Sequence, residues 1–532
     1  MPACLGAHGQ QIAPPASPQV GVPAREHAIM IGFSKPAFAT PPDSTSHPGP
    51  SWRYCASAAV LGALAYVNSL HNPFVYDDQT EILRNPSIRA LSGLAQLVRY
   101  SPTRPLTNVS YAVDYAFTAV DPLAYHLTNV VLHVVAVVLL FLLMRRVIGD
   151  VEGAGEHESS RKADVAAFAA SSLFAVHPMM TEAVGYTSAR AELLCAVFFL
   201  GGIIAFRHAF TSQRPAWLTA GIGLLALALA SKETGVMLPF VLLAYDRLIV
   251  CSSVEDRRWR LTAVCLPLVA TVAALGAVRI WMYVGLEHPA THAPFWRAVA
   301  MDVYVTGRYL GMLAFPYHQT IMPSVLPIES VLETRVLIAA MVVVLLIRGA
   351  YVVRKRLPVV TFGIAWFVLL LLPSAALLIL SDIGQPMAEH RVYLASCGVF
   401  MAVGGAVSRI VPAGRTGKGR RLVTHGTLAV VLAVLLALTV QRNRVWGDPI
   451  GLWQEATRRA PRTWMAHFGL ADAYRQQGNL GAAAASYERA IAIRPDRTEL
   501  YMDLVNVLIE LRQFDRAKDV LGRAFRASPC QQ

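Results

Sequence analysis

Long apolar stretches separated by short polar segments run through most of this chain. A membrane-spanning helix needs about 20 mostly apolar residues. Candidate spans lie at 54–70, 126–144, 163–180, 190–206, 215–230, 234–250, 261–284, 332–350, 358–380, 392–410 and 422–440. The pattern therefore predicts an all-α, polytopic membrane domain over residues 51–440, with eleven spans.

A twelfth apolar stretch, 298–316, decides how the spans are oriented. If it does not span and the N-terminus lies inside, the inner segments carry 19 Lys and Arg and the longer outer segments only 10. This asymmetry follows the positive-inside rule. Asp302, Thr306 and Tyr309 also recur at helical spacing, which indicates a helix lying in the membrane interface. We therefore expect 298–316 not to span.

An internal repeat begins after residue 440. Leu470, Ala471, Tyr474, Ala483, Tyr487, Ala490 and Pro495 are matched 34 residues later by Leu504, Val505, Leu508, Ala517, Leu521, Ala524 and Pro529. This is the period of tetratricopeptide helix pairs. Residues 441–532 are therefore predicted to form a short α-solenoid of two and a half repeats. Its Arg-rich groove is expected to bind an acidic or Ser/Thr-rich acceptor segment and to add no catalytic group.

Composition narrows the class of protein further. The chain is 55% hydrophobic and 15% charged, whereas soluble domains carry about 25% charged residues. The net charge of +13 is accounted for by the inner segments, so no nucleic-acid partner is predicted. No CxxC pair indicates zinc, no cofactor is predicted, and a divalent metal is compatible but not indicated. Residues 1–50 are rich in Pro, Ala and Ser and are predicted to be a disordered tail.

With this orientation, the polar clusters of the membrane domain all fall at outer ends of spans. They are YDDQTE (76–81), RPLTN (104–108), HPMMTEAV (177–184), RAE (190–192), SKETG (231–235) and AEHRVY (388–393). A charged side chain deep in lipid costs about 2.5–3.5 kcal/mol on insertion scales. Six such clusters on one face therefore indicate a site.

Each cluster also has a structural interpretation. Asp78 and Glu81 have capping-box spacing, whereas Asp77 has no such role, which favours Asp77 as the functional acid. Arg104 could anchor the chain at the interface. The pairs Lys232–Glu233 and Arg190–Glu192 could simply neutralise each other. His126 and His177 lie at span ends, and Pro178 is expected to shape the turn there.

These residue types together predict one chemistry. A carboxylate at the water boundary can take a proton from a hydroxyl nucleophile, and nearby cations can hold a phosphate. An apolar flank between helices can hold a lipid tail. The prediction is sugar transfer from a polyprenyl phosphate, with inversion at the anomeric carbon. The candidate catalytic residues are Asp77 and Asp78, and the candidate substrate-binding residues are Arg104, His126, His177, Glu182, Arg190, Glu192, Lys232, Glu233, Glu389, His390 and Arg391.

Several stretches in this order resemble one family. They are FVYDD, RPLTNVSYAVDY, AYHLTNVVLH, FAVHPMMTEAV, RAELL, SKETG, AEHRVYLAS and the repeats. The chain resembles the transmembrane and tetratricopeptide repeat-containing O-mannosyltransferases, which have a C-type glycosyltransferase (GT-C) fold. The resemblance implies a polyprenyl-phosphate sugar donor, most often of mannose, and Ser or Thr acceptors in exported proteins. It also implies that the first acid of the pair, Asp77, is the catalytic base.

The sequence leaves the cellular location and two alternative functions open. Arg outnumbers Lys 41 to 6, which is typical of a GC-rich bacterial genome. We therefore expect the bacterial inner membrane, with site and repeats on the periplasmic face, or the luminal face of the endoplasmic reticulum in a eukaryote. The alternatives are a GT-C enzyme that modifies a glycan or lipid, and a non-catalytic membrane scaffold. The polar clusters favour an enzyme, because a scaffold needs only repeats and an anchor.

Overall fold

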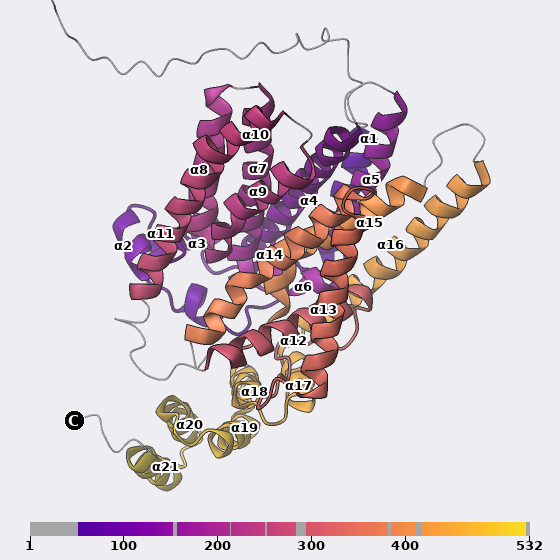
Figure 1. Ribbon diagram of the computed structural model, residues 1–532. Coiled ribbons are helices and arrows are strands. Elements are labelled where there is room, and N and C mark those ends of the chain that lie inside the picture. The colour runs from indigo at the N-terminus through magenta and orange to yellow at the C-terminus, as the bar shows by residue number, and fades with distance from the viewer. Residues whose placement is uncertain are drawn as a thin grey trace, which may run out of the picture. The chain divides into compact units, whose positions relative to one another are not determined.

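The computed structural model describes residues 52–152, 157–212, 214–250, 253–282, 294–380, 385–410 and 418–527. In these ranges the chain forms helices and no strands, which confirms the all-α prediction (Figure 1). The described residues all belong to one compact unit. The tail predicted at 1–50 lies outside the described residues.

Each predicted span coincides with a helix. These helices are α1 (Trp52–Leu64), α4 (Pro122–Glu152), α5 (His157–Val176), α7 (Arg190–Ser212), α8 (Pro215–Ser231), α9 (Leu238–Leu248), α11 (Leu266–Met282), α13 (Thr334–Val353), α14 (Pro358–Leu380), α15 (Tyr393–Ile410) and α16 (Lys418–Trp446). Five further helices connect them among the described residues, namely α2 (Leu94–Tyr100), α3 (Pro105–Thr118), α6 (Thr181–Gly185), α10 (Val254–Trp259) and α12 (Phe295–Ala314).

Fewer helices than expected are long enough to cross a membrane. Among the described residues, six are long and apolar enough, and a bent pair, Ser160–Val176 with Pro178–Gly185, would make a seventh. The expected number of eleven is therefore too high by this criterion. The reason is length: α1 has 13 residues and α9 has 11. At about 1.5 Å per residue they are shorter than the roughly 30 Å hydrocarbon core.

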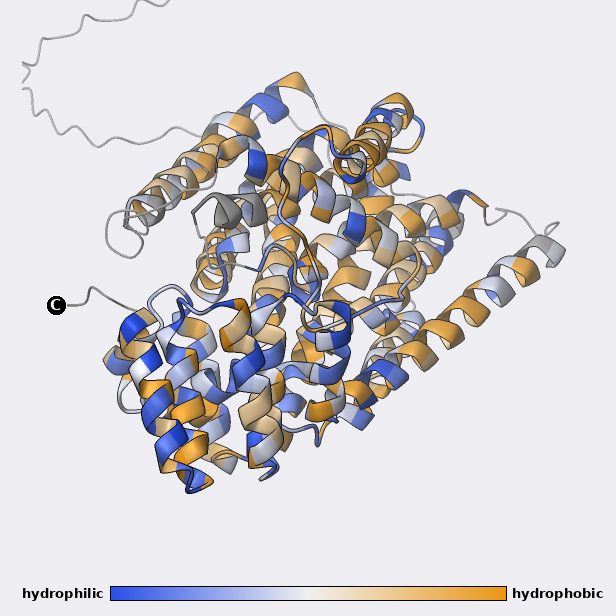
Figure 2. Ribbon diagram, turned by 90° about the horizontal axis from the view of Figure 1, so that it is seen from below, coloured by the Kyte–Doolittle hydropathy of each residue, from blue (hydrophilic) through white to orange (hydrophobic). Residues whose placement is uncertain are grey.

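The long helices pack closely through small residues. Gly363 of α14 faces Gly398 of α15, and a Cβ atom on either would overlap the carbonyl oxygen of the other. Such small residues allow close backbone approach between membrane helices. Most residues of the long helices are hydrophobic, whereas hydrophilic residues are frequent in the repeats (Figure 2).

The helix α12 covers the stretch that decides the orientation. It is not among the described helices that are long and apolar enough to span, and it packs against α13 and α14. Thr306 and Tyr309 are buried, and the Tyr309 hydroxyl donates to the carbonyl oxygen of Ala388 at 2.7 Å. The expected polar stripe is therefore packed mainly against protein rather than turned to the interface.

The repeats form the helices expected of them. They are α17 (Pro449–Arg459), α18 (Trp464–Gln476), α19 (Leu480–Ile493), α20 (Thr498–Glu510) and α21 (Phe514–Ala527). Two pairs, α18 with α19 and α20 with α21, follow the half repeat α17, as predicted. Buried Ala471, Ala483 and Ala490 allow the close packing that the repeat pattern requires.

The repeats are not separate from the membrane helices. Residue 440, the predicted boundary, lies inside α16. One apolar cluster contains Val75, Tyr186 and Trp446 together with Trp453 and Leu470 from the repeats. Burying such a cluster contributes about 25 cal/mol per Å² of apolar area. The repeats are therefore fixed against the segment that carries Asp77.

Candidate active site

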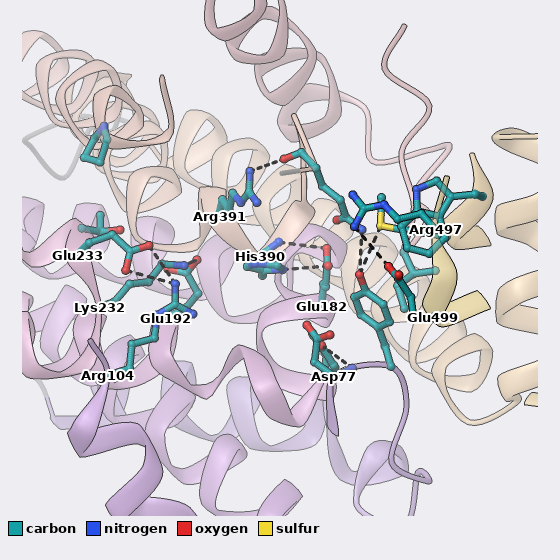
Figure 3. A pocket seen from close by; sticks show the side chains of 18 residues that line it. Asp77, Arg104, Glu182, Glu192, Lys232, Glu233, His390, Arg391, Arg497 and Glu499 are labelled. Carbon is teal, nitrogen blue, oxygen red and sulfur yellow. Dashed lines mark hydrogen bonds and ion pairs between the residues drawn. The ribbon is translucent and has the colours of Figure 1, made fainter. Parts of the chain in front are cut away.

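A cavity of about 480 Å³ lies where the polar clusters meet the repeats (Figure 3). Eight of the thirteen candidate residues line it, namely Asp77, Arg104, Glu182, Glu192, Lys232, Glu233, His390 and Arg391. They come from six separate segments of the chain. In Figure 3, Arg104, Glu192, Lys232 and Glu233 form one group, and Asp77 and Glu182 lie nearer to Arg497 and Glu499 of the repeats.

Asp77 lies in a turn with an unusual backbone. The residue before it, Tyr76, has φ of 53°, a left-handed conformation that costs a bulky residue about 1–3 kcal/mol. Aromatic packing holds Tyr76 there, with ring centroids 5.5 Å from Trp453 and 6.2 Å from Tyr186. The amide of Asp77 donates to the Tyr186 hydroxyl at 3.1 Å. The turn is therefore fixed from both the membrane domain and the repeats.

The Asp77 side chain is exposed to the cavity but surrounded by protein. This recess raises its pKa above the usual value, whereas a hydrogen bond from Tyr186 and the charge of Arg104 act to lower it. A raised pKa strengthens a carboxylate as a base once it is ionised.

Asp78, by contrast, is fully engaged and buried. Its carboxylate accepts hydrogen bonds from the amide of Val75 at 3.1 Å and from the amide and hydroxyl of Ser188 at 2.7 and 2.5 Å. It makes no side-chain cap to the helix η2 (Gln79–Leu83), so the capping box with Glu81 does not form. Burial raises the pKa of Asp78 to about 7 against these hydrogen bonds. Asp78 thus positions the turn against η5 (Thr187–Ala189) and does not reach the cavity.

Most charges in the cavity are paired, but not as the sequence suggested. Arg104 pairs with Glu233 at 3.0 Å, and Lys232 pairs with Glu192. The suggested neighbour pairs, Lys232–Glu233 and Arg190–Glu192, are therefore wrong. Burial would raise the pKa of Glu233, but the charges of Arg104 and Lys232 hold it at about 2.

The other polar groups of the cavity include an imidazole, a second arginine pair and Arg391. His390 Nδ1 contacts Glu182 at 2.9 Å, and Arg497 pairs with Glu499 at 3.3 Å. The Arg391 guanidinium donates to the carbonyl oxygen of Gln385 at 2.7 Å. Among the described residues, neither Asp77 nor Arg391 forms an ion pair. One carboxylate and one guanidinium are thus left for a ligand.

Four other candidate residues lie outside the cavity. Arg190 is fully buried, where it contacts Asp114 at 2.5 Å and donates to Asn129 at 2.7 Å and to the carbonyl oxygen of Tyr125 at 2.8 Å. With its donors used in this way, Arg190 holds α3, α4 and α7 together. The expected contact with donor phosphate is not available to it.

Glu389 and the two histidines have similar structural roles. Glu389 is buried and accepts from the amide of Thr320 at 2.7 Å. His126 Nε2 lies 2.9 Å from the carbonyl oxygen of Asn72, and His177 Nε2 lies 3.1 Å from that of Leu313. His177 also accepts from the amide of Met179 and so begins the turn at Pro178, as expected. None of the three reaches the cavity.

Sequence reasoning missed part of the cavity wall. Trp464, Met465, Arg497 and Glu499 from the repeats line it, although no contribution from the repeats was expected. The repeat pattern specifies the buried packing positions and says nothing about these four, which are partly buried or exposed. Tyr76 could have been found, because an aromatic side chain precedes the predicted base directly.

No cluster for a metal is formed by the described residues: no three His, Cys, Asp or Glu side chains are placed to hold one ion. The cavity carboxylates other than Asp77 instead face cations or His390.

The chain was compared with known proteins. Residues 437–498 match the tetratricopeptide repeat family. The protein O-mannosyl-transferase TMTC4 of Mus musculus is 24% identical over 495 residues, covering 80% of this chain and 64% of that protein. TMTC1 of Homo sapiens is 24% identical over 83% of this chain and 55% of its own length. Tmtc1 of Drosophila melanogaster is 33% identical over 194 residues, 34% of this chain and 21% of that protein.

The chain thus spans less than two-thirds of the length of each of these relatives. No solved structure matches it significantly. The resemblance predicted from the motifs is confirmed over about four-fifths of the chain. The chain is a homologue of the TMTC proteins, which are named protein O-mannosyl-transferases, and it carries tetratricopeptide repeats at its C-terminal end.

Proposed function

We propose that this chain is an integral membrane glycosyltransferase that moves mannose from a polyprenyl phosphate to Ser or Thr hydroxyls of exported proteins. One observation carries the proposal: Arg104, Lys232 and Arg497 each face a carboxylate, whereas Asp77 and Arg391 line the same cavity and form no ion pair among the described residues. A free base and a free guanidinium are what hydroxyl activation and phosphate binding require.

The transfer is a single displacement. The acceptor hydroxyl oxygen bonds to the anomeric carbon as the bond from that carbon to the phosphate oxygen breaks. The electron pair of that bond leaves on the lipid phosphate, and the hydroxyl proton passes to Asp77. One base and direct attack invert the anomeric centre, by analogy with inverting glycosidases.

Donor binding follows from the remaining cavity wall. Arg391 can hold the phosphate by two parallel hydrogen bonds. Lys232 and Arg104 add positive potential beside it, although each also faces a carboxylate. Pro373 of α14 and Ile321 give the cavity an apolar part for the start of the lipid chain.

The direct test uses purified protein with polyprenyl-phosphate mannose and a Ser/Thr-containing peptide, with mass spectrometry of the product. Asp77→Asn keeps the size of the side chain but removes the proton acceptor, so turnover should fall about 10²–10⁴-fold. Glu81→Gln is the matched control, because Glu81 lies in the same segment outside the cavity. Parental turnover by Asp77→Asn would rule out this base.

Other results separate the alternatives. Transfer by the parent to a glycan or lipid but not to peptide would favour a different GT-C acceptor. A folded parent that transfers sugar to no acceptor would favour a scaffold. Reporter fusions described below test the proposed periplasmic face.

A further inference from the structure

A second cavity also borders the Asp77 turn. It has a volume of about 120 Å³ and is formed by the segment 74–84 and by α17 and α18 of the repeats. Tyr76 and Asp77 line both cavities. Asp77 is therefore reachable from two directions, one from the charged cavity and one from the repeats.

The two cavities differ in chemistry. The larger one is lined by nine carboxylate, guanidinium, ammonium or imidazole side chains besides Asp77, whereas the smaller has only Arg84 and Asp472 besides Asp77. Its other lining includes the aromatic rings of Phe74 and Phe468 and the amides of Gln79 and Gln476. Amide side chains both donate and accept, which matches a peptide backbone. The smaller cavity therefore suits a near-neutral polypeptide rather than a phosphate.

The volume and position of the smaller cavity further restrict which ligand it can hold. A cavity needs about 10–15 Å³ of such volume per water, so 120 Å³ has room for a short stretch of chain with small side chains. The first helix of each repeat also carries polar residues at matching positions. Asp472 and Gln476 in α18 are followed 34 residues later by Asn506 and Glu510 in α20, so the polar row that begins at the smaller cavity continues along the repeats. This row is not basic, so the expected acidic acceptor is not favoured.

We propose that the smaller cavity is the acceptor site, where an extended, near-neutral polypeptide segment with small side chains lies along α18 and presents its Ser or Thr to Asp77. This inference rests on the proposed function. An inverting displacement needs the nucleophile and the leaving phosphate on opposite sides of the anomeric carbon. Two cavities that share Asp77 give the donor and the acceptor separate places beside the same residue.

The test compares two adjacent glutamines. Gln476 and Gln477 are both exposed at the end of α18, but only Gln476 lines the smaller cavity. Gln476→Trp should raise the Michaelis constant for a neutral Ser/Thr peptide at least tenfold and leave that for polyprenyl-phosphate mannose unchanged. Gln477→Trp should behave as the parent. Equal peptide constants for the two variants would overturn the inference, as would a raised donor constant in Gln476→Trp.

A binding measurement separates this inference from the proposed reaction. A photoreactive benzoylphenylalanine replaces Gln476 or Gln477 in the Asp77→Asn protein, so no turnover is needed. Cross-linking of the peptide at 476 but not at 477 supports the acceptor site, even if the parent proves inactive with mannose. Equal labelling at both positions, or none at 476 in a folded protein, overturns it.

Discussion

Asp77 and Asp78 are neighbours in sequence with opposite surroundings. Asp78 accepts three hydrogen bonds from Val75 and Ser188, which fix the turn. Asp77 is held through its amide by Tyr186, so its carboxylate is free to face the cavity. Two adjacent carboxylates at a membrane edge are thus explained by two roles: one positions the turn and the other is open to a substrate.

Replacing the Tyr186 hydroxyl should change the pH dependence of transfer. The base works when ionised, so kcat/KM falls as the pH drops through the pKa of Asp77. The Tyr186 hydrogen bond lowers that pKa, which burial has raised, so Tyr186→Phe should move the acidic limb upward. The measurement is the pH dependence of kcat/KM for the parent and for Tyr186→Phe, and we expect the acidic limb of the variant at higher pH.

Tyr115→Phe is the control for this pH profile, because Tyr115 lies outside both cavities. An acidic limb that stays in place in Tyr186→Phe, or moves to lower pH, would contradict a positioning role for this hydroxyl.

Part of the site could be predicted from residue types and part could not. Charged groups at the ends of membrane spans are costly to bury in lipid, so the sequence alone predicts a site there. Their partners were not predictable, because Arg104 meets Glu233 across 129 positions of the chain. The same holds for Arg190, whose burial depends on how three helices pack.

At the scale of elements, α17 and α18 approach each other through a glycine. A Cβ atom on Gly469 would overlap the indole ring of Trp453, which in turn packs on Tyr76. Gly469→Ala should therefore destabilise the protein by about 1–3 kcal/mol through overpacking. Because Trp453 supports the Asp77 turn, transfer should fall as well.

Gly481 provides the matched substitution. Nothing lies within 4 Å of a Cβ atom placed on Gly481 in α19. Gly481→Ala should therefore stabilise the helix by about 0.5–1 kcal/mol. Thermal unfolding of the purified proteins measures both changes. Equal melting temperatures for the two variants would show that the contact between Gly469 and Trp453 does not control stability.

The helices of the repeats could be predicted from the 34-residue period and the composition, because such a repeat specifies which helix faces are buried. The contact between the repeats and the Asp77 turn could not be predicted in this way. Partly buried repeat positions such as Trp464 and Arg497 are not specified by that pattern, so their place in the cavity wall depends on tertiary structure.

At the scale of the whole molecule, the cavity and the repeats lie at one end of the helix bundle (Figure 1). In a bacterial host, alkaline phosphatase fused after residue 446 should be active and green fluorescent protein fused there should be dark. Fusions after residue 212, in a predicted inner segment, should give the opposite result. Fluorescence at 446 would mean that the predicted orientation is inverted there.

The number of spans could not be predicted from apolar length alone. Apolar length in sequence does not reveal where a helix breaks, as the 57° bend between α5 and the helix after His177 shows. Lys and Arg are counted over whole loops, so their asymmetry does not depend on where a helix breaks. It can therefore indicate the orientation of the helices even where hydropathy miscounts the spans.

The contact between Tyr76 and Trp453 joins residues made at very different times during synthesis. From Asp77 to Trp464 of the cavity wall, the ribosome adds nearly 400 residues, which takes roughly 20–80 s at 5–20 residues per second. Until then the proposed base has been synthesised but the cavity lacks one wall. A chain that stops early would therefore be unable to form the complete cavity, so formation of the cavity reports that synthesis has passed the first repeat.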